Sequence, residues 1–305
     1  MSGTIKDNFR GFIYSLQDDI CTKLETVDGK ARFQEDPWQR EGGGGGRTRV
    51  MERGSVFEKA GVSTSEVHGE LPDLIRQRFG VDQGWFYAAG ISLVIHPESP
   101  MVPTVHANFR YFELYEIQGG PIVDAWFGGG ADLTPYYLQD EDARHFHKVF
   151  KDSCDRYDET LYARYKEKCD DYFFNTHRNE ARGIGGIFFD YLRETPQKPH
   201  TYWLELVTAL GASFLPAYIP IVERRKDEEY NEKQRYFQEI RRGRYVEFNL
   251  IHDRGTLFGL KTNGRTESIL MSLPPRVRWD YNHQPEPGSR EAYTLGVLKN
   301  PKDWA

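Results

Sequence analysis

The stretch 104-TVHANFRYFELYEI-117 decides the fold, because polar and apolar residues alternate along much of its length. Successive side chains of a β-strand point to opposite faces of a sheet, so this alternation predicts a strand. A second strand is predicted over residues 122–127, after a short connector that contains Gly119 and Gly120. Such a connector is typical of a hairpin, and the two strands are therefore expected to pair antiparallel.

Strands and helices follow one another in blocks on both sides of this hairpin. Residues 9–24 carry apolar side chains three and four positions apart, which predicts a helix with one buried face. Further helices are predicted over residues 140–174, 204–218 and 227–242, and further strands over residues 85–95, 183–189, 245–252 and 256–261. Because strands and helices do not alternate as βαβ units, the expected class is α+β.

The expected architecture is a large, mostly antiparallel β-sheet sandwiched between layers of helices. No repeat and no linker rich in Pro or Ser divides the chain, so residues 1–305 are expected to form a single domain. Residues 1–50 form its leading segment, a helix followed by a loop that ends in five glycines, residues 42–46. This glycine run fits a flexible linker and a functional loop equally well.

The composition argues against several classes of protein. The 305 residues include 40 Lys and Arg against 46 Asp and Glu, and this net charge of −6 does not favour nucleic-acid binding. The absence of an apolar run of about 18 residues predicts no membrane span. The first thirty residues resemble neither a secretory signal nor a transit peptide. Three cysteines, few and odd in number, fit a reducing compartment, so a cytoplasmic location is expected.

One face of the predicted 104–117 strand carries groups that suit an anion. His106, Asn108 and Arg110 share this face by strand parity, whereas their neighbours along the chain point to an apolar face. Ser92 and His96 share a face of the preceding strand in the same way. A solvent-exposed sheet face would show a similar pattern, but it is normally rich in Lys, Glu and Thr. The set of imidazole, amide and guanidinium groups favours an anionic ligand.

Three glycine-containing segments offer further candidates. In 126-WFGGGADLTP-135, the glycines predict a close backbone approach with Asp132 aimed from a turn, although Asp132 capping the next helix is equally plausible. The segment 182-RGIGG-186 leads into a strand and lacks the dinucleotide-binding spacing. In 241-RRGRYVEFNL-250, the arginines suit a solvated helix end or an anion site, and Tyr245 and Glu247 are predicted to share a strand face.

Several long motifs resemble the oxygen-dependent coproporphyrinogen III oxidase family. They are VFEKAGV, HPESPMVPTVHANFRYFE, WFGGGADLTPYY, CDDYFF, RGIGGIFFD, RRGRYVEFNL, RGTLFGL and ESILMSLPP, and they cover nearly the whole chain. The resemblance implies that two propionates of coproporphyrinogen III, on rings A and B, are converted to vinyl groups. Protoporphyrinogen IX, a haem precursor, would form with consumption of O2 and release of CO2 and H2O2. It also implies a homodimer, formed around residues 240–275, and no organic cofactor.

The resemblance also implies roles for individual residues. His106 corresponds to a proton donor, Asp132 to an acid that holds pyrrole nitrogens, and Arg110 to a further residue of the reaction site. Arg110 and Arg265 are the candidates for binding substrate propionates. The implied substrate contacts are Ser92, Asn108, Arg110, Tyr245, Glu247, Asn263, Gly264 and Arg265. Phe109 is a further candidate, because an aromatic ring could line a site for a large flat macrocycle. Tyr191 departs from the family, which usually has a second Asp after Asp190.

A divalent metal is the least supported part of this interpretation. Some bacterial members assign one to the histidines that correspond here to His96, His106, His145 and His177. These four have no ligand-type spacing, so a metal site would have to be assembled by the fold. A metal-dependent oxygenase and a tetrapyrrole carrier without turnover are therefore the alternatives to a cofactor-free oxidase.

Overall fold

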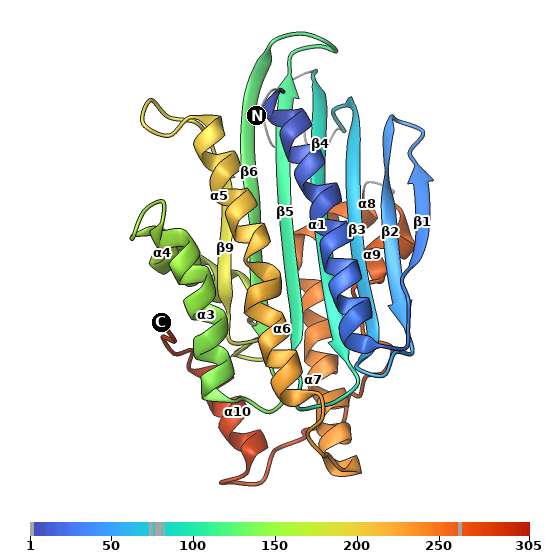
Figure 1. Ribbon diagram of the computed structural model, residues 1–305, viewed down its shortest axis with the longest axis vertical. Coiled ribbons are helices and arrows are strands. Elements are labelled where there is room, and N and C mark those ends of the chain that lie inside the picture. The colour runs from blue at the N-terminus through green and yellow to red at the C-terminus, as the bar shows by residue number, and fades with distance from the viewer. Residues whose placement is uncertain (1–2, 73–75, 77–80, 82, 262–263) are drawn as a thin grey trace.

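The computed structural model describes residues 3–72, 76, 81, 83–261 and 264–305, and within them a seven-stranded antiparallel sheet forms the centre of the molecule (Figure 1). The strand order is β1-β2-β3-β4-β5-β6-β9. The strands are β1 (Gln34–Gln39), β2 (Gly44–Glu52), β3 (Phe57–Glu70), β4 (Trp85–Pro97), β5 (Thr104–Tyr115), β6 (Ile122–Thr134) and β9 (Gly186–Leu192). The predicted hairpin is confirmed as the antiparallel pair β5–β6.

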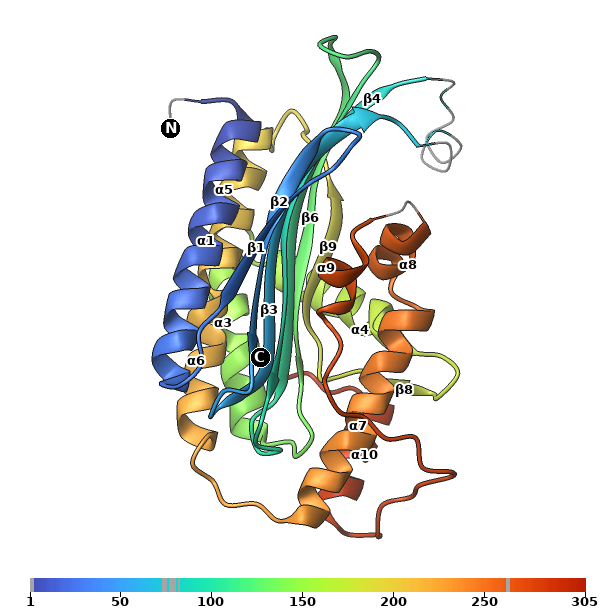
Figure 2. The same cartoon turned by 90° about the vertical axis from the view of Figure 1, so that its right-hand side faces the viewer.

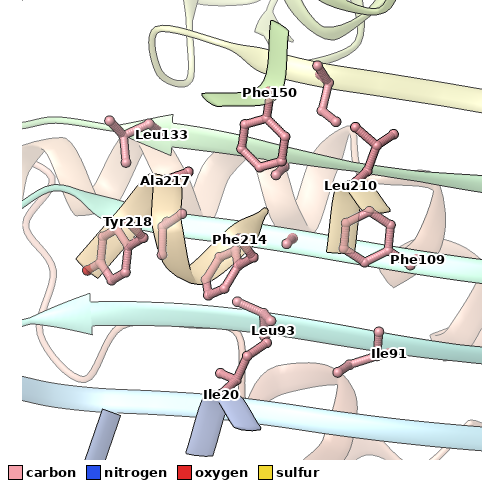
Figure 3. Close-up of a cluster of buried hydrophobic side chains, with 14 of the residues drawn as sticks. Ile20, Ile91, Leu93, Phe109, Leu133, Phe150, Leu210, Phe214, Ala217 and Tyr218 are labelled. Atoms are coloured by element: carbon pink, nitrogen blue, oxygen red, sulfur yellow. The ribbon is translucent and has the colours of Figure 1, made fainter. Parts of the chain in front are cut away.

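One layer of helices covers one face of this sheet. It consists of α1 (Ile5–Asp28), α3 (Asp140–Asp155), α5 (His200–Ala212) and α6 (Phe214–Arg225), which Figure 2 shows on the same side. Thr4 caps α1 by accepting a hydrogen bond from the Asp7 backbone N–H at 3.1 Å. Apolar side chains from this layer interdigitate with those of the sheet, as Figure 3 shows for Ile20, Phe214 and Leu93. This face holds the main hydrophobic core.

A second layer lies on the opposite face of the sheet. It is built from α7 (Glu232–Ile251), α8 (Arg254–Lys261) and α9 (Thr266–Leu270) (Figure 2). Helix α4 (Leu161–Tyr172) packs against the edge strand β9, and the short strands β7 (Phe174–Asn175) and β8 (Glu180–Ala181) pair beside α7. Helix α10 (Arg290–Lys299) contacts β8. The predicted sandwich of a sheet between helices is confirmed.

The continuous helical stretch α5–α6 is the one place where length and composition would allow a membrane span within the described residues. The stretch runs over His200–Arg225, and 61% of its most apolar part is buried inside the protein. Its buried residues pack against α1 and α3 as part of the main core. The helix therefore has the features of a core helix of this sandwich.

Two predicted strands are wrong. Residues 245–252 belong largely to α7, and residues 256–261 belong to α8. The predicted 227–242 helix is the beginning of α7, which starts with a capping box between Asn231 and Gln234 and continues to Ile251. The error has a physical cause: most side chains from Arg235 to Asn249 are buried, so α7 shows no polar stripe that would reveal a helical period.

The glycine run is neither a linker nor a loose loop. Gly44, Gly45 and Gly46 lie in β2 and pair with β3, and Gly45 and Gly46 also pair with β1. A Cβ atom at Gly45 would lie 2.2 Å from the Trp38 carbonyl oxygen. Gly43 forms the turn with a φ of 109°. The glycines therefore allow close packing in a β-hairpin that sequence reasoning missed.

Candidate active site

Three polar side chains of β5 point toward the second helical layer. His106, Asn108 and Arg110 are half-buried, and the residues between them are buried in the main core. The predicted alternation of the two faces is therefore confirmed. Ser92 lies directly opposite Asn108 on β4 and is exposed, although β4 is a central strand. This part of the sheet face is open to a ligand.

Phe109 points the other way. Its ring is 1% exposed and lies 6.5 Å from the Phe12 ring of α1, between the sheet and the first helical layer. A ligand on the open face meets His106 and Asn108 but is separated from Phe109 by the sheet itself. Phe109 is thus a core residue, which removes it from the candidate substrate contacts.

His106 is anchored by a buried carboxylate. The Asp132 Oδ1 atom lies 2.8 Å from His106 Nδ1 and accepts a second hydrogen bond from Arg182 Nη2 at 2.7 Å. Asp132 lies within β6, so it is neither a turn residue nor a helix cap. Burial would raise the pKa of Asp132, but the Arg182 charge and the bond to His106 outweigh it and lower the pKa. Asp132 is therefore an ionised group deep in the structure.

A directed chain of hydrogen bonds connects this carboxylate to Arg110. Because ionised Asp132 can only accept, His106 Nδ1 carries the proton between them, and in the neutral ring Nε2 is then the acceptor. Asn108 Nδ2 lies 3.3 Å from His106 Nε2, and Arg110 Nη1 donates to Asn108 Oδ1 at 3.3 Å. Arg110 also pairs with Asp190 of β9 at 3.1 Å. One proton arrangement thus satisfies the whole row.

Arg182 is a central residue of the site that sequence reasoning missed. Its guanidinium lies 4.0 Å from the Phe173 ring centre and 4.6 Å from that of Tyr245. It also donates to Asn249 Oδ1 of α7 at 2.9 Å. Arg182 therefore joins the sheet, through Asp132, to the second helical layer. Tyr245 and Asn249 are four positions apart, so on a helix they lie on the same side. This spacing is the sequence signal that could have indicated a shared partner for them.

Asp253 is a second residue that sequence reasoning missed. It follows α7 and accepts hydrogen bonds from Tyr172 Oη at 2.8 Å and from the Thr256 hydroxyl at 2.7 Å. Burial would raise the pKa of Asp253, but the hydrogen bonds from Thr256 and Tyr172 outweigh burial and lower it. A second ionised carboxylate therefore lies near His106.

Tyr245 and Glu247 do not share a face, because they lie on a helix. Tyr245 points to the sheet, where its ring is 5.3 Å from that of His96. Glu247 points away and accepts hydrogen bonds from Arg178 at 2.7 and 2.8 Å and from Arg244 at 2.9 Å. Burial would raise the pKa of Glu247, but these arginines and His177 lower it to about 2. The predicted common face is wrong.

The other predicted substrate contacts lie at the far side of the sheet. Asn263 lies outside the described residues, and Gly264 and Arg265 connect α8 to α9. Arg265 forms an ion pair with Asp36 of β1. A row of directly paired residues runs across the sheet from this point: Asp36, Thr48, Ser63, Ser92 and Asn108. Four strand spacings separate its ends, which corresponds to about 19 Å.

The four histidines of the possible metal site are not brought together. His145 on α3 lies in the first helical layer, with its Nε2 3.0 Å from the Pro216 carbonyl oxygen. His177 contacts His252 at 2.9 Å beside α7, on the other side of the sheet. His96 is buried, and its Nε2 lies 2.8 Å from the Ser272 carbonyl oxygen. Among the described residues, no group of three or more His, Cys, Asp or Glu side chains could hold a metal ion. The predicted ligand set is therefore wrong.

The position that departs from the family pattern has a different use here. Tyr191 has a φ of 56°, and its ring lies 4.8 Å from that of Trp126. The guanidinium of Arg193 lies 4.9 Å from its ring centre. In the part of the chain that the structure describes, Asp190 supplies the carboxylate that pairs with Arg110 at this edge.

Comparisons with known proteins agree with these motifs. Residues 8–304 match the family model for coproporphyrinogen III oxidase. A similar protein, an oxygen-dependent coproporphyrinogen-III oxidase, chloroplastic, from Glycine max, is 49% identical over 312 residues. The aligned region covers 99% of this chain and 80% of that protein. The chain therefore belongs to the coproporphyrinogen III oxidase family.

Proposed function

We propose that the protein is an oxygen-dependent oxidase that converts coproporphyrinogen III to protoporphyrinogen IX in haem biosynthesis. Each of the propionates on rings A and B reacts with one O2 and one proton and yields a vinyl group, one CO2 and one H2O2. Two electrons leave the propionate as its carboxyl carbon departs as CO2, and O2 accepts them. The substrate and O2 thus supply the redox chemistry that an organic cofactor carries in other enzymes.

The open sheet face is the observation that carries this proposal. Arg110 and Arg265 lie near opposite ends of a polar row about 19 Å long. A flat macrocycle with four carboxylates needs cations at its rim and a floor without bulky side chains. Ser63 and Ser92 supply small side chains on this floor, and Gly130, which pairs with Asn108, has none. Guanidinium groups suit propionates because they bind carboxylates with two parallel hydrogen bonds.

His106 is the residue that we assign to proton transfer. Each decarboxylation consumes a proton, and an imidazole nitrogen on the open sheet face can donate one to a bound substrate. Asp132 orients the ring through Nδ1 and leaves Nε2 directed along the polar row. A direct bond from Asp132 to the pyrrole N–H groups, the role that the resemblance implies, does not fit its 1% exposure and its bonds to Arg182 and His106.

The deciding experiment compares coproporphyrinogen III turnover under air and under argon, with products identified by mass. Vinyl products that form only under air support the oxidase. Substrate binding without product under either gas would instead indicate a carrier. Parallel reactions with thoroughly chelated protein test the metal-dependent alternative, because activity that requires added metal would contradict the cofactor-free reaction.

Two further properties belong to this proposal. We place a homodimer contact around residues 240–275, where Leu250 and Ile251 are 41% and 54% exposed at the end of α7. Sedimentation of the protein and of a Leu250→Glu/Ile251→Glu variant tests this, and a monomeric wild type would contradict it. We also propose a cytoplasmic location, which imaging of a tagged protein in its native cell tests.

A further inference from the structure

A cavity lies on the side of α7 that faces away from the sheet. Its volume is about 160 Å³, and one wall is the helical face that carries Ile240, Arg241 and Arg244. Arg178, Glu180, the 282–285 loop and Lys299 of α10 complete it. Figure 2 shows α7, β8 and α10 close together in this part of the molecule. The cavity is separate from the open sheet face, because α7 lies between the two.

Positive charge predominates around this cavity. Arg178, Arg241, Arg244 and Lys299 line it, and Glu180 is the one acid among its lining residues in the described part of the chain. Glu180 is committed to Arg241 at 2.7 Å. Glu247, behind the wall, is shared by Arg178 and Arg244 at 2.7 and 2.9 Å. The four cations that line the cavity therefore face two acids, Glu180 and Glu247, which leaves an excess of positive charge.

The arginines are also crowded and partly desolvated. Arg241 is 5% exposed and Arg244 is 9% exposed. Burial lowers the pKa of Arg244, and the charges of Arg178 and Arg241 lower it further against the opposing charge of Glu247. Like charges held this close repel one another, and an anion between them would remove the repulsion.

We propose that this cavity binds a small tetrahedral oxyanion of the phosphate class. Its volume lies below the roughly 300–1,000 Å³ typical of sites for drug-sized ligands, which excludes the tetrapyrrole substrate. Guanidinium groups present paired N–H donors that match phosphate oxygens. Bound there, the anion would be shared by Arg178 of the β7–β8 connection, Arg244 of α7 and Lys299 of α10. It would thus hold in place the helix that carries Tyr245 and Asn249.

The test is calorimetric titration of the full chain with phosphate at constant ionic strength, with chloride as the balancing anion. We expect saturable binding of one phosphate, about tenfold weaker in Arg244→Gln because a charged donor is lost. Glu247 keeps Arg178 and His177 in this variant. Lys299→Gln, a change at an exposed residue, is expected to weaken binding several-fold. Arg144→Gln is the control, because Arg144 lies on α3 and its side chain is 67% exposed.

Several results would overturn the assignment. They are the absence of saturable binding, equal affinity in Arg244→Gln and Arg144→Gln, and displacement of phosphate by coproporphyrinogen. Malonate binding more tightly than phosphate would overturn the ligand class. If Arg244→Gln fails to fold, as judged by near-UV circular dichroism, Lys299→Gln decides. The measurement needs no turnover, so it stands or falls independently of the oxidase activity.

Discussion

At the scale of single residues, the site depends on an ion pair that is almost completely buried. The side chains of Asp132 and Arg182 are 1% and 2% exposed. Removing one partner of such a pair leaves the other charged and desolvated, which costs more than removing both. Because Asp132 also orients His106 and Arg182 also binds Asn249, the pair couples the reactive face to the packing of α7.

Asp132→Asn should therefore damage both stability and turnover. We expect a loss of about 3–5 kcal/mol in the free energy of unfolding, because Arg182 keeps its buried charge. We expect kcat to fall about 100-fold or more, because His106 loses the anion that orients it. Urea unfolding and oxygen-dependent turnover measure the two effects. Adding Arg182→Met should restore stability but not activity, and a single variant with wild-type kcat would contradict the role of Asp132.

His147 predicts how stability depends on pH. Its Nδ1 lies 2.8 Å from the Tyr162 hydroxyl and its Nε2 lies 3.1 Å from the Ile184 carbonyl oxygen, so the buried ring is held neutral. Burial and the nearby Lys166 lower its pKa to about 3. Its unfolded pKa is about 6.5, so the unfolded chain binds one more proton between these values and stability falls as the pH decreases.

The expected contribution of His147 is about 1.4 kcal/mol per pH unit below about pH 6. Buried His96, whose pKa is also lowered by burial, adds a slope of the same sign. Urea unfolding of wild type and His147→Gln from pH 6 to pH 4 measures the difference. In His147→Gln, the free energy of unfolding is expected to fall less steeply with decreasing pH, by about 1.4 kcal/mol per pH unit. Identical slopes in the two proteins would show that His147 is not held neutral.

At the scale of elements, β5 could be predicted and α7 could not. The core side of β5 is packed by α1 while its other side is half-buried, so a period of two is visible in the sequence. Helix α7 contacts the sheet on one side, through Tyr245. On its other side, Glu247 and Gly243 contact the segment 276–279. A helix packed on all sides has no apolar stripe, and its internal glycine suggests a break.

The same contrast explains which site residues were found. His106, Asn108 and Arg110 share one strand face, so local parity was enough to group them. Arg182 meets Asp132 50 positions away and Asn249 67 positions away, and local periodicity holds no record of such contacts.

Gly243 provides a test of how α7 is packed. Replacing a helical glycine by alanine normally stabilises a helix by about 1 kcal/mol. At Gly243 the new Cβ would lie 2.4 Å from the Arg278 backbone oxygen, so we expect Gly243→Ala to destabilise by about 1–3 kcal/mol. Gly11→Ala, at an exposed position of α1, is the matched control, because nothing in the described residues lies within 4 Å of the added Cβ. Thermal unfolding should give opposite signs, and stabilisation by both changes would contradict this packing.

At the scale of the whole molecule, the two helical layers are attached to the sheet by different forces. The layer of α1, α3, α5 and α6 shares one continuous apolar core with the sheet. Helix α7 contributes only Phe237 and Phe248 to two small apolar clusters, and it is also held by arginines, including Arg235 and Arg242, which pair with Glu58 of β3 at 2.7 and 2.6 Å. Apolar burial is a net gain in free energy, whereas buried ion pairs roughly repay their desolvation. The α7 layer lies on the same side of the sheet as His106, Asn108 and Arg110. This layer is therefore expected to unfold locally at a lower free energy than the layer of α1, α3, α5 and α6.

Glu58→Gln tests this order of opening. The change removes the carboxylate from Arg242, which is fully buried, and leaves the main core untouched. We expect the free energy of local opening of α7 to fall by about 1.4 kcal/mol or more. This change corresponds to at least tenfold faster hydrogen exchange of the α7 amides. Amides of α1 and α5, which open with the apolar core, should keep their wild-type rates. Mass spectrometry of exchanged peptides resolves the two layers, and equal acceleration in α1 and α7 would show that the molecule opens as one cooperative unit.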